Sequence, residues 1–390
     1  MWDCFSRLTL NLDRTNISIF GLLDRQEETQ YLIALSKVNG VGDVAAKKLI
    51  AYSGGAKQVF EQKRSFLERI PGIGQILANA VASSDLLKEA DNEIDRCEKA
   101  NVKIITYLNP DYPQRLRHCD DSPIVLYTKG NFEPNPERIV SIVGTRNATR
   151  HGVETTEKLV AALAEVNVTI VSGLAFGIDI AAHRAALKFG TPTIGVIAHG
   201  LHTISPTGHR NTAAEMLANG GIVSDFGMGS PAMPENFPSR NRIIAGMADA
   251  TIVVESAAKG GSLITADVAN SYNRDVFAIP GRVSDPYSEG CNKLIKDLKA
   301  ALIGSGDDVL TAMGWQPNPN EPKQQKQTKL LIDLTPDQEK VVSVLRQQNQ
   351  TIDRLAVLTE LPMSKVASVL LELEFEGVVS NLPGKVYKLN

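Results

Sequence analysis

The stretch ADATIVVESAAKGGSLITADVANSYNRDVFAIPG, residues 248–281, decides the fold of this chain. Its β-branched run at 250–254 is followed by a glycine turn and then by residues 262–273, which have the length and pattern of a helix. A second apolar run follows at 275–279. A strand, a helix and a strand in succession predict a parallel βαβ unit.

The same alternation extends over residues 138–312. Because six apolar strands joined by helical crossovers place helices on both faces of one sheet, the sequence predicts an α/β fold with a doubly wound, parallel, Rossmann-like sheet. The four further strand-like runs, each followed by a stretch of helical character, are RIVSIVG (138–144), VTIVSG (168–173), PTIGVIAHG (192–200) and GGIVSDF (220–226).

Length and composition set the class of protein. A chain of 390 residues is too long for one compact core and predicts roughly two to four domains. No apolar run reaches the about 18 residues of a membrane span, and the N-terminus lacks the pattern of a signal peptide, so no membrane partner is expected. The formal net charge of −3 means that nucleic-acid binding, if present, must come from local clusters of charge.

The cysteines point to a reducing compartment. Cys4, Cys97, Cys119 and Cys291 are scattered without CxxC spacing. This argues against a zinc knuckle and against a disulfide framework, and it fits reduced thiols, so we expect a cytoplasmic protein.

Residues 28–98 are predicted to form a helical domain with an internal repeat. ALSKVNGVGDVAAKKLI (34–50) and FLERIPGIGQILANAV (66–81) share an apolar helix, a G-x-G turn and a second helix that starts with small residues. This is the helix-hairpin-helix (SAM-like) pattern, in which the amides that open the second helix can face a DNA phosphate. The alternative is that the hairpins only pack a small helical domain. The secondary DNA contacts expected here are Gly40, Gly42, Gly72, Gly74, Lys47 and Lys48.

The other segments complete the predicted organisation. Residues 1–27 match no pattern and form an unassigned extension. The proline-rich segment 102–137 predicts a connection with short strands, so the core with its leading segment spans 99–314. Residues 315–330 predict a polar linker. Residues 331–390 have the order of a winged-helix domain, and their six basic and eight acidic side chains favour packing or protein contact over DNA reading.

The loops at the ends of the predicted strands form the candidate binding site, because ligands of open α/β sheets bind beyond the carboxyl ends of the strands. The stretch NFPSRNRIIAG (236–246) adds two arginines and an amide at the start of a helix, with an aromatic ring that can stack on a base. The candidate residues are Gly144, Thr145, Arg146, Ser172, Gly173, Phe237, Arg240, Asn241, Arg242, Lys259, Gly260, Gly261 and Ser262.

The residue types in these loops are those that bind phosphate. Exposed amides at a helix N-terminus attract anions, and arginine binds phosphate through two parallel hydrogen bonds. Several such loops on one edge predict a phosphate groove in a chain that is acidic elsewhere. Because the alternation of side chains argues against Arg240 and Arg242 pointing the same way, a structural salt bridge is the alternative for one of them.

Cofactors and metals are not indicated. The turn after the first strand reads GTRNATRHG rather than G-x-G-x-x-G, which argues against a dinucleotide, and the chain has no P-loop and no G-x-S-x-G elbow. Asp179 and His183 lie one helical turn apart, yet no nearby run completes a set of metal ligands. We therefore interpret His183 as a packing or hydrogen-bonding residue.

Several motifs in one order resemble the DprA/Smf (DNA-processing protein A) family over residues 100–312. The resemblance implies a non-enzymatic protein that binds single-stranded DNA, dimerises, and loads the recombinase RecA onto incoming strands in natural transformation. It also implies a groove built from the turns at 144–146, 240–242 and 259–262. The motifs are SIVGTRNATRHG, VSGLAFGIDIAAHRAAL, FPSRNRIIAGMADATIVVESAAKGGSLITADVANSYNRDVFAIPG and GCNKLIKDLKAALIGSGDDVL.

An enzymatic alternative stays open. Related doubly wound sheets with a GG turn before a helix cleave nucleoside monophosphates with a carboxylate on that helix, and Asp267 has a suitable spacing. However, Leu263 and Ile264 stand where such enzymes keep glycine and threonine. A nucleotide-sensing module that uses the same pocket is a third interpretation.

Overall fold

The computed structural model describes residues 27–131, 133–315, 335–346, 348–375, 378–382 and 386–389. The chain divides into two compact units, Met1–Gln316 and Pro317–Asn390. The predicted extension at 1–27 and the predicted linker at 315–330 lie outside the described residues, apart from residues 27 and 315. Among the described helices, none is long and apolar enough to cross a membrane.

The first unit is built on one nine-stranded sheet with the strand order β1-β2-β6-β5-β4-β3-β7-β8-β9. The six predicted strands form its centre and run parallel to one another, so the predicted doubly wound α/β fold is confirmed. They are β3 (Ile139–Val143), β4 (Thr169–Ser172), β5 (Thr193–Val196), β6 (Gly220–Ser224), β7 (Ala250–Val253) and β8 (Asp275–Ala278).

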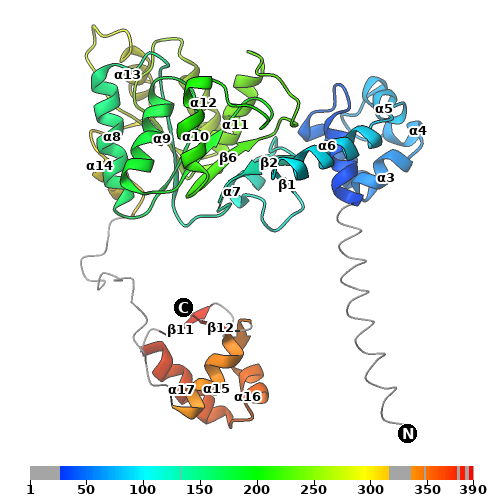
Figure 1. Cartoon of the computed structure of the whole chain (residues 1–390), viewed down its shortest axis with the longest axis vertical. Coiled ribbons are helices and arrows are strands. Elements are labelled where there is room, and N and C mark those ends of the chain that lie inside the picture. Colours follow the sequence, from blue (N-terminus) through cyan, green and yellow to red (C-terminus); the bar gives the residue numbers. More distant parts are fainter. Residues whose placement is uncertain are drawn as a thin grey trace. The chain divides into compact units, whose positions relative to one another are not determined.

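Helices cover both faces of this sheet (Figure 1). Successive side chains of a strand point to opposite faces, so Val143 of β3 joins one apolar cluster and Ile142 joins the other. The face of Val143 is covered by α7 (Gln114–Arg117), α11 (Asn236–Met247), α12 (Gly261–Ser271) and α13 (Glu289–Lys296). The face of Ile142 is covered by α8 (Arg150–Ala164), α9 (Ile178–Phe189) and α14 (Gly306–Ala312), with α10 (Arg210–Met216) packed beside α9.

The edges of the sheet differ from the prediction. β1 (Lys103–Thr106) and β2 (Val125–Lys129) pair antiparallel, and β2 pairs antiparallel with β6. The predicted connecting segment is therefore part of the sheet. At the other edge, β9 (Ala301–Leu302) adds a parallel strand that the sequence pattern does not predict, because two exposed residues carry no periodicity.

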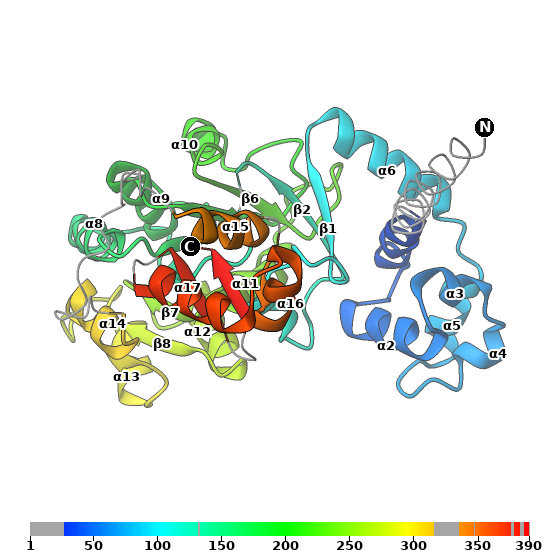
Figure 2. The ribbon, with the colours of Figure 1, turned by 90° about the horizontal axis from the view of Figure 1, so that it is seen from below.

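The region predicted to be helical forms a helical domain within the same compact unit. Leu32, Leu49 and Leu67 are fully buried in its core. Its last helix, α6, leads into β1 (Figure 2). The elements are a helical segment at 27–36, α2 (Asp43–Ser53), α3 (Ala56–Glu61), α4 (Arg64–Leu67), α5 (Gln75–Ala82) and α6 (Leu87–Lys99).

The two predicted hairpins share one backbone conformation. Gly40 and Gly72 have φ angles of +81° and +84°, in the left-handed region that glycine adopts without strain. Two residues later, Gly42 and Gly74 are the N-caps of α2 and α5. The repeat in the sequence is therefore a repeat in the structure, although the two copies have different surroundings.

The second unit has the predicted winged-helix order of helices followed by a β-hairpin. Thr335 begins the first helix with a capping box, in which its hydroxyl and the side chain of Gln338 each bond the other's backbone N–H. Val341, Leu355 and Val366 are buried in its core. Its elements are α15 (Pro336–Leu345), β10 (Gln350–Thr351), α16 (Ile352–Thr359), α17 (Met363–Phe375), β11 (Val379–Leu382) and β12 (Val386–Leu389).

Candidate nucleic-acid interface

The carboxyl ends of β3 and β7 open into a cavity of about 400 Å³, which we call the strand-end groove. The turn after β3 meets the first turns of α11 and α12 there, at the edge of the sheet where open α/β folds bind ligands. The predicted residues that line it are Gly144, Thr145, Arg146, Phe237, Arg240, Asn241, Gly260, Gly261 and Ser262.

Close packing holds the turn after β3. A Cβ atom on Gly144 would lie 2.5 Å from Cγ1 of Ile178, so a larger residue would clash there. The backbone N–H of Thr145 donates to the carbonyl of Glu255 at 2.8 Å, and the Thr145 carbonyl accepts from the N–H of Ile178 at 3.2 Å. The turn that carries Arg146 is therefore fixed by the protein before any ligand binds.

A buried carboxylate that the sequence analysis did not single out fixes the next part of this loop. Glu255 is only 6% exposed, and its carboxylate accepts hydrogen bonds from the backbone N–H of Thr149, at 2.9 Å, and from the Thr149 hydroxyl. Thr149 is in turn the N-cap of α8. The signal that could have revealed Glu255 is an acidic residue directly after the β-branched run at 250–254, in VVES (253–256).

Arg146 is the exposed cation at the mouth of the groove. Its guanidinium carbon lies 5.0 Å from the ring centroid of Phe237, which is within the range of a cation–π contact. Among the described residues, no carboxylate lies within ion-pair distance of Arg146. The predicted cation and the predicted aromatic residue are thus brought together, and the charge of Arg146 is left for a ligand.

The start of α12 supplies backbone donors. Gly260 is its N-cap, and the first turn carries neither an acidic residue nor a side-chain cap. The N–H of Leu263 donates to the carbonyl of Gly260 at 3.1 Å, whereas the N–H groups of Gly261 and Ser262 have no partner within the helix. The hydroxyl of Ser262 donates to Oγ of Ser256 at 2.9 Å. Lys259 does not line the groove, but it is exposed and directly precedes Gly260.

Arg240 differs from the predicted phosphate-binding arginine. It is 4% exposed, and Nη1 donates to the carbonyl of Gly173 at 2.6 Å and to the carbonyl of Val196. Burial lowers the pKa of Arg240 to about 10, although Asp179 raises it, and burial raises the pKa of Asp179, although Arg240 lowers it. Arg240 therefore places a fixed positive charge in the wall of the groove, and its side chain does not reach out.

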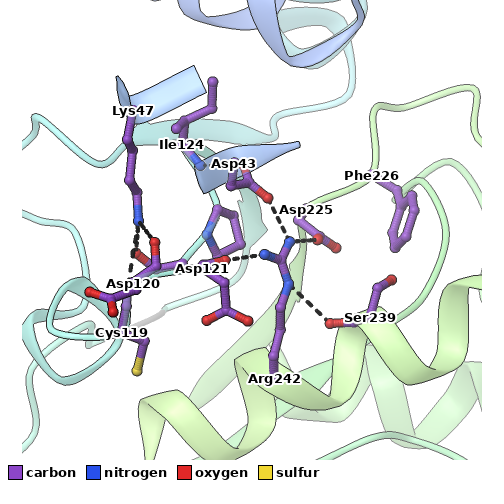
Figure 3. A network of polar contacts seen from close by, with 12 residues as sticks. Asp43, Lys47, Cys119, Asp120, Asp121, Ile124, Asp225, Phe226, Ser239 and Arg242 are labelled. Carbon is purple, nitrogen blue, oxygen red and sulfur yellow. Dashed lines mark hydrogen bonds and ion pairs between the residues drawn. The ribbon is translucent and has the colours of Figure 1, made fainter. Parts of the chain in front are cut away.

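Arg242 requires a larger correction, because its side chain does not line the groove. Nη2 donates to Asp43 at 2.8 Å and to Asp225 at 2.9 Å, while Nη1 donates to the carbonyl of Asp121 (Figure 3). Burial acts to lower the pKa of Arg242, but Asp225 and Asp43 outweigh it and raise that pKa. The predicted alternative of a structural salt bridge describes this residue.

The first hairpin contacts the core of the protein through the first turns of α2. Asp43, the first residue of α2, binds Arg242 and also accepts the backbone N–H of Ile124 at 2.9 Å. Lys47 donates to the carbonyl of Asp120 at 3.0 Å and to the hydroxyl of Ser122 at 2.6 Å (Figure 3 shows its contacts with the 119–121 loop). Asp43 and Lys47 therefore join the helical domain to the core, so Lys47 differs from the predicted free phosphate-binding lysine. Gly40 and Gly42 are exposed, and their contact with DNA stays a prediction.

The second hairpin is open. Gly72 and Gly74 are exposed, Ile76 in the first turn of α5 is 84% exposed, and that turn carries no acidic residue. Lys48 reaches this hairpin, since its Nζ lies 3.2 Å from the place that a Cβ on Gly72 would take. Of the two copies, the second keeps the features expected of a phosphate contact.

The remaining predicted residues lie beneath the groove or away from it. Ser172 is buried and donates to the carbonyl of Ile142 at 2.6 Å, and Gly173 provides its carbonyl to Arg240. His183 is buried, with Nδ1 2.7 Å from Oγ1 of Thr193, and burial lowers its pKa to about 3. As expected, it is a hydrogen-bonding residue in the packing between helix and sheet. No cluster of potential metal ligands occurs within the described residues.

Comparisons with known proteins show the family to which this chain is similar. The family model described as DNA recombination-mediator protein A matches residues 103–314, and a DprA winged helix domain matches residues 325–385. Protein Smf of Synechocystis is 32% identical, over 93% of this chain and 98% of its own. The DNA processing protein DprA of Streptococcus pneumoniae is 42% identical, over 51% of this chain and 70% of its own.

Two solved structures are similar to this chain. The X-ray structure of DprA from S. pneumoniae has a TM-score of 0.62 and 32% identity, covering 73% of this chain and 97% of that one. DprA from Helicobacter pylori has a TM-score of 0.50 and 28% identity, covering 55% of this chain and 96% of that one. The latter structure concerns a mode of single-stranded DNA binding by the H. pylori protein.

Replacement of Arg242 tests its structural assignment. Arg242→Ala would leave Asp43 and Asp225 close together without their cation. We expect the free energy of unfolding to fall by about 3–5 kcal/mol, because removal of one partner leaves buried charge uncompensated. Denaturant unfolding of the variant measures this. The control is Arg282→Ala, at an exposed arginine, which should leave stability unchanged; equal stability of the two variants would contradict the assignment.

Proposed function

Because the chain belongs to the DNA recombination-mediator protein A family, we propose that it binds single-stranded DNA in the strand-end groove without making or breaking a covalent bond. The observation that carries the proposal is the exposed Arg146 guanidinium, stacked on Phe237 at the mouth of a groove whose wall holds the buried charge of Arg240. The similar H. pylori protein, whose structure concerns single-stranded DNA binding, supports the same ligand.

Phosphates of the strand are bound from two sides of the groove. Arg146 presents a planar, unpaired guanidinium from the turn after β3. The opening N–H groups of α12 and the exposed Lys259 approach from the turn after β7. A helix start without an acidic residue attracts anions, and a nearby lysine adds charge.

The bases contact the aromatic and polar side chains between these phosphate donors. Phe237 is half-buried, so one part of its ring is fixed by the protein while the remainder faces the groove. Stacking on an aromatic ring or on a guanidinium plane is sequence-tolerant, because every base has a π-face. We therefore expect the protein to bind strands of different sequence with similar affinity and to require unpaired bases.

The enzymatic alternative requires a catalytic carboxylate in the groove, and the predicted candidate, Asp267, does not lie there. Asp267 does not line the cavity, and its Oδ1 lies 2.8 Å from Nζ of Lys299. We expect no release of base when the protein is incubated with nucleoside monophosphates, measured by chromatography of the products. Release of base that is abolished by Asp267→Asn would establish the enzymatic alternative instead.

We also propose, from the family, that the protein acts as a homodimer and loads RecA onto the bound strand. The free edge of the sheet supports self-association. Leu298 and Leu302, beside and within β9, are 93% and 58% exposed, and β9 has one neighbour in the described sheet. Large apolar side chains at an open strand edge favour burial against a second copy.

Charge removal at the groove tests the proposed site. Arg146→Ala and Lys259→Ala should each weaken binding of a labelled single-stranded oligonucleotide about tenfold, since loss of a charged hydrogen bond costs about 1.5 kcal/mol. The slope of log affinity against log salt should decrease in magnitude by about 0.7 for each phosphate that the variant no longer binds. Fluorescence anisotropy across a salt series measures both quantities.

The matched control is Lys103→Ala, which removes one positive charge from β1 at the far edge of the sheet. It should bind the oligonucleotide as the unaltered chain does. If Arg146→Ala and Lys259→Ala keep full affinity and a normal circular dichroism spectrum, the strand-end groove is not the binding site.

Adjacent lysines test the open hairpin. We propose that the second hairpin makes an accessory phosphate contact through Lys48, whereas Lys47 is engaged with Asp120 and Ser122. Lys48→Ala should reduce affinity for long strands and leave the melting temperature unchanged. Lys47→Ala should lower the melting temperature, because it removes those two hydrogen bonds. The same affinity for Lys48→Ala and the unaltered chain on every strand length would exclude the accessory contact.

A further inference from the structure

A second cavity, of about 760 Å³, lies between α8 and α9 and borders the strand-end groove. We call it the α8–α9 groove. Arg146 and Asn147 line both cavities, so a strand that leaves one passes directly into the other. The residues of the second cavity that carry the argument are Arg146, Val153, Phe176, Ile180, Arg184 and Lys188.

Phe176 presents an aromatic ring to this groove. It is 54% exposed, although burial is the usual fate of such a large apolar side chain. Its position is fixed by an edge-on contact with His209, with ring centroids 4.9 Å apart and an angle of 71° between the ring planes. His209 is itself buried, and its Nδ1 lies 2.8 Å from the Leu174 carbonyl. Phe176 is therefore an outward-facing ring on a rigid support.

The polar groups of the groove are mostly cations. Arg146 and Arg184 are exposed, and no described residue pairs with either guanidinium through a salt bridge. Lys188 forms an ion pair with Glu157, the acidic residue of the lining. Arg184 and Lys188 are four residues apart on α9, so they share one face. Because Glu157 already pairs with Lys188, Arg184 is the cation of this face whose charge is left for a ligand.

The floor of the groove is apolar. Ile180 and Ala185 of α9 are 7% and 4% exposed, and Val153 of α8 rises beside them with 39% exposure. Cations along the rim, an exposed ring and an apolar floor are the surface that stacks bases and follows a phosphate backbone. A duplex would present its bases to this surface only after opening, whereas a single strand presents them directly.

We propose that the α8–α9 groove is a second segment of the single-stranded DNA site, in which Phe176 stacks on a base and Arg184 binds a phosphate. Arg146 stands at the border and serves both segments. This inference rests on the proposed function, because it extends the path of the same strand. Phe176 and Arg184 therefore contribute to the binding of long strands and do not contribute to the binding of short ones.

A series of oligothymidylates of increasing length tests the inference. Phe176→Ala and Arg184→Ala should bind the shortest oligonucleotides, which fill the strand-end groove alone, as tightly as the unaltered chain does. On long oligonucleotides each variant should lose affinity about five- to tenfold. The salt slope of Arg184→Ala should decrease in magnitude by about 0.7 on long strands only.

A matched control lies on α8. Lys158→Ala removes an exposed charge from this helix, and Lys158 does not line the groove. It should bind every length normally. Phe176→Trp gives a direct signal of stacking, because its fluorescence should be quenched by long oligonucleotides and unaffected by short ones.

The outcomes separate this inference from the proposed function. If Lys259→Ala weakens binding at all lengths while Phe176→Ala and Arg184→Ala match the unaltered chain at all lengths, the α8–α9 groove does not bind the strand and the strand-end groove does. If Phe176→Ala and Arg184→Ala lose affinity on long strands while Lys259→Ala loses none at any length, the second segment stands and the proposed site fails. Quenching of Phe176→Trp by an acidic peptide but not by DNA would overturn the inference in favour of a protein ligand.

Discussion

The buried guanidinium of Arg240 is the interaction on which the candidate site depends. A charged group with 4% exposure requires partners inside the protein, since an unpaired buried charge is strongly unfavourable. Its partners are the carbonyls at the ends of β4 and β5 and the carboxylate of Asp179 on α9. These contacts hold α11 against the sheet edge. Phe237, one helical turn earlier on α11, is thereby presented at the mouth of the groove, where Arg146 stacks on it.

Arg242, two residues further along α11, contacts a different part of the protein because of helix geometry. Each residue of an α-helix advances by about 100°, so Arg240 and Arg242 point about 200° apart. Arg240 enters the sheet edge, whereas Arg242 enters the junction with the helical domain and binds Asp43. As a result the two hairpins have different surroundings. The copy with an aspartate at its helix start is used for docking within the chain, and the copy with Gln75 at that position stays open.

An acidic chain can bind DNA when its cations are distributed unevenly. Lys103 and Lys299 lie in ion pairs with Asp111 and Asp267, and their charges are largely neutralised. In the part of the chain that the structure describes, Arg146 and Arg184 have no such carboxylate, and both line the connected grooves. A cleft lined by one sign of charge concentrates counter-ions of the other sign, so the net charge of −3 does not set the potential at this edge.

The sequence by itself determined the parallel strands, the hairpin repeat, the winged-helix order and most of the groove. These are properties of short segments, because periodicity, glycine turns and helix starts depend on residues a few positions apart. Tertiary structure alone decided the direction of the two arginines, the pairing of β1 and β2 with the sheet, the role of Glu255 and the existence of the α8–α9 groove. Arg242 and Asp43 are 199 positions apart, and no local pattern records which carboxylate a folded chain will bring to a given guanidinium.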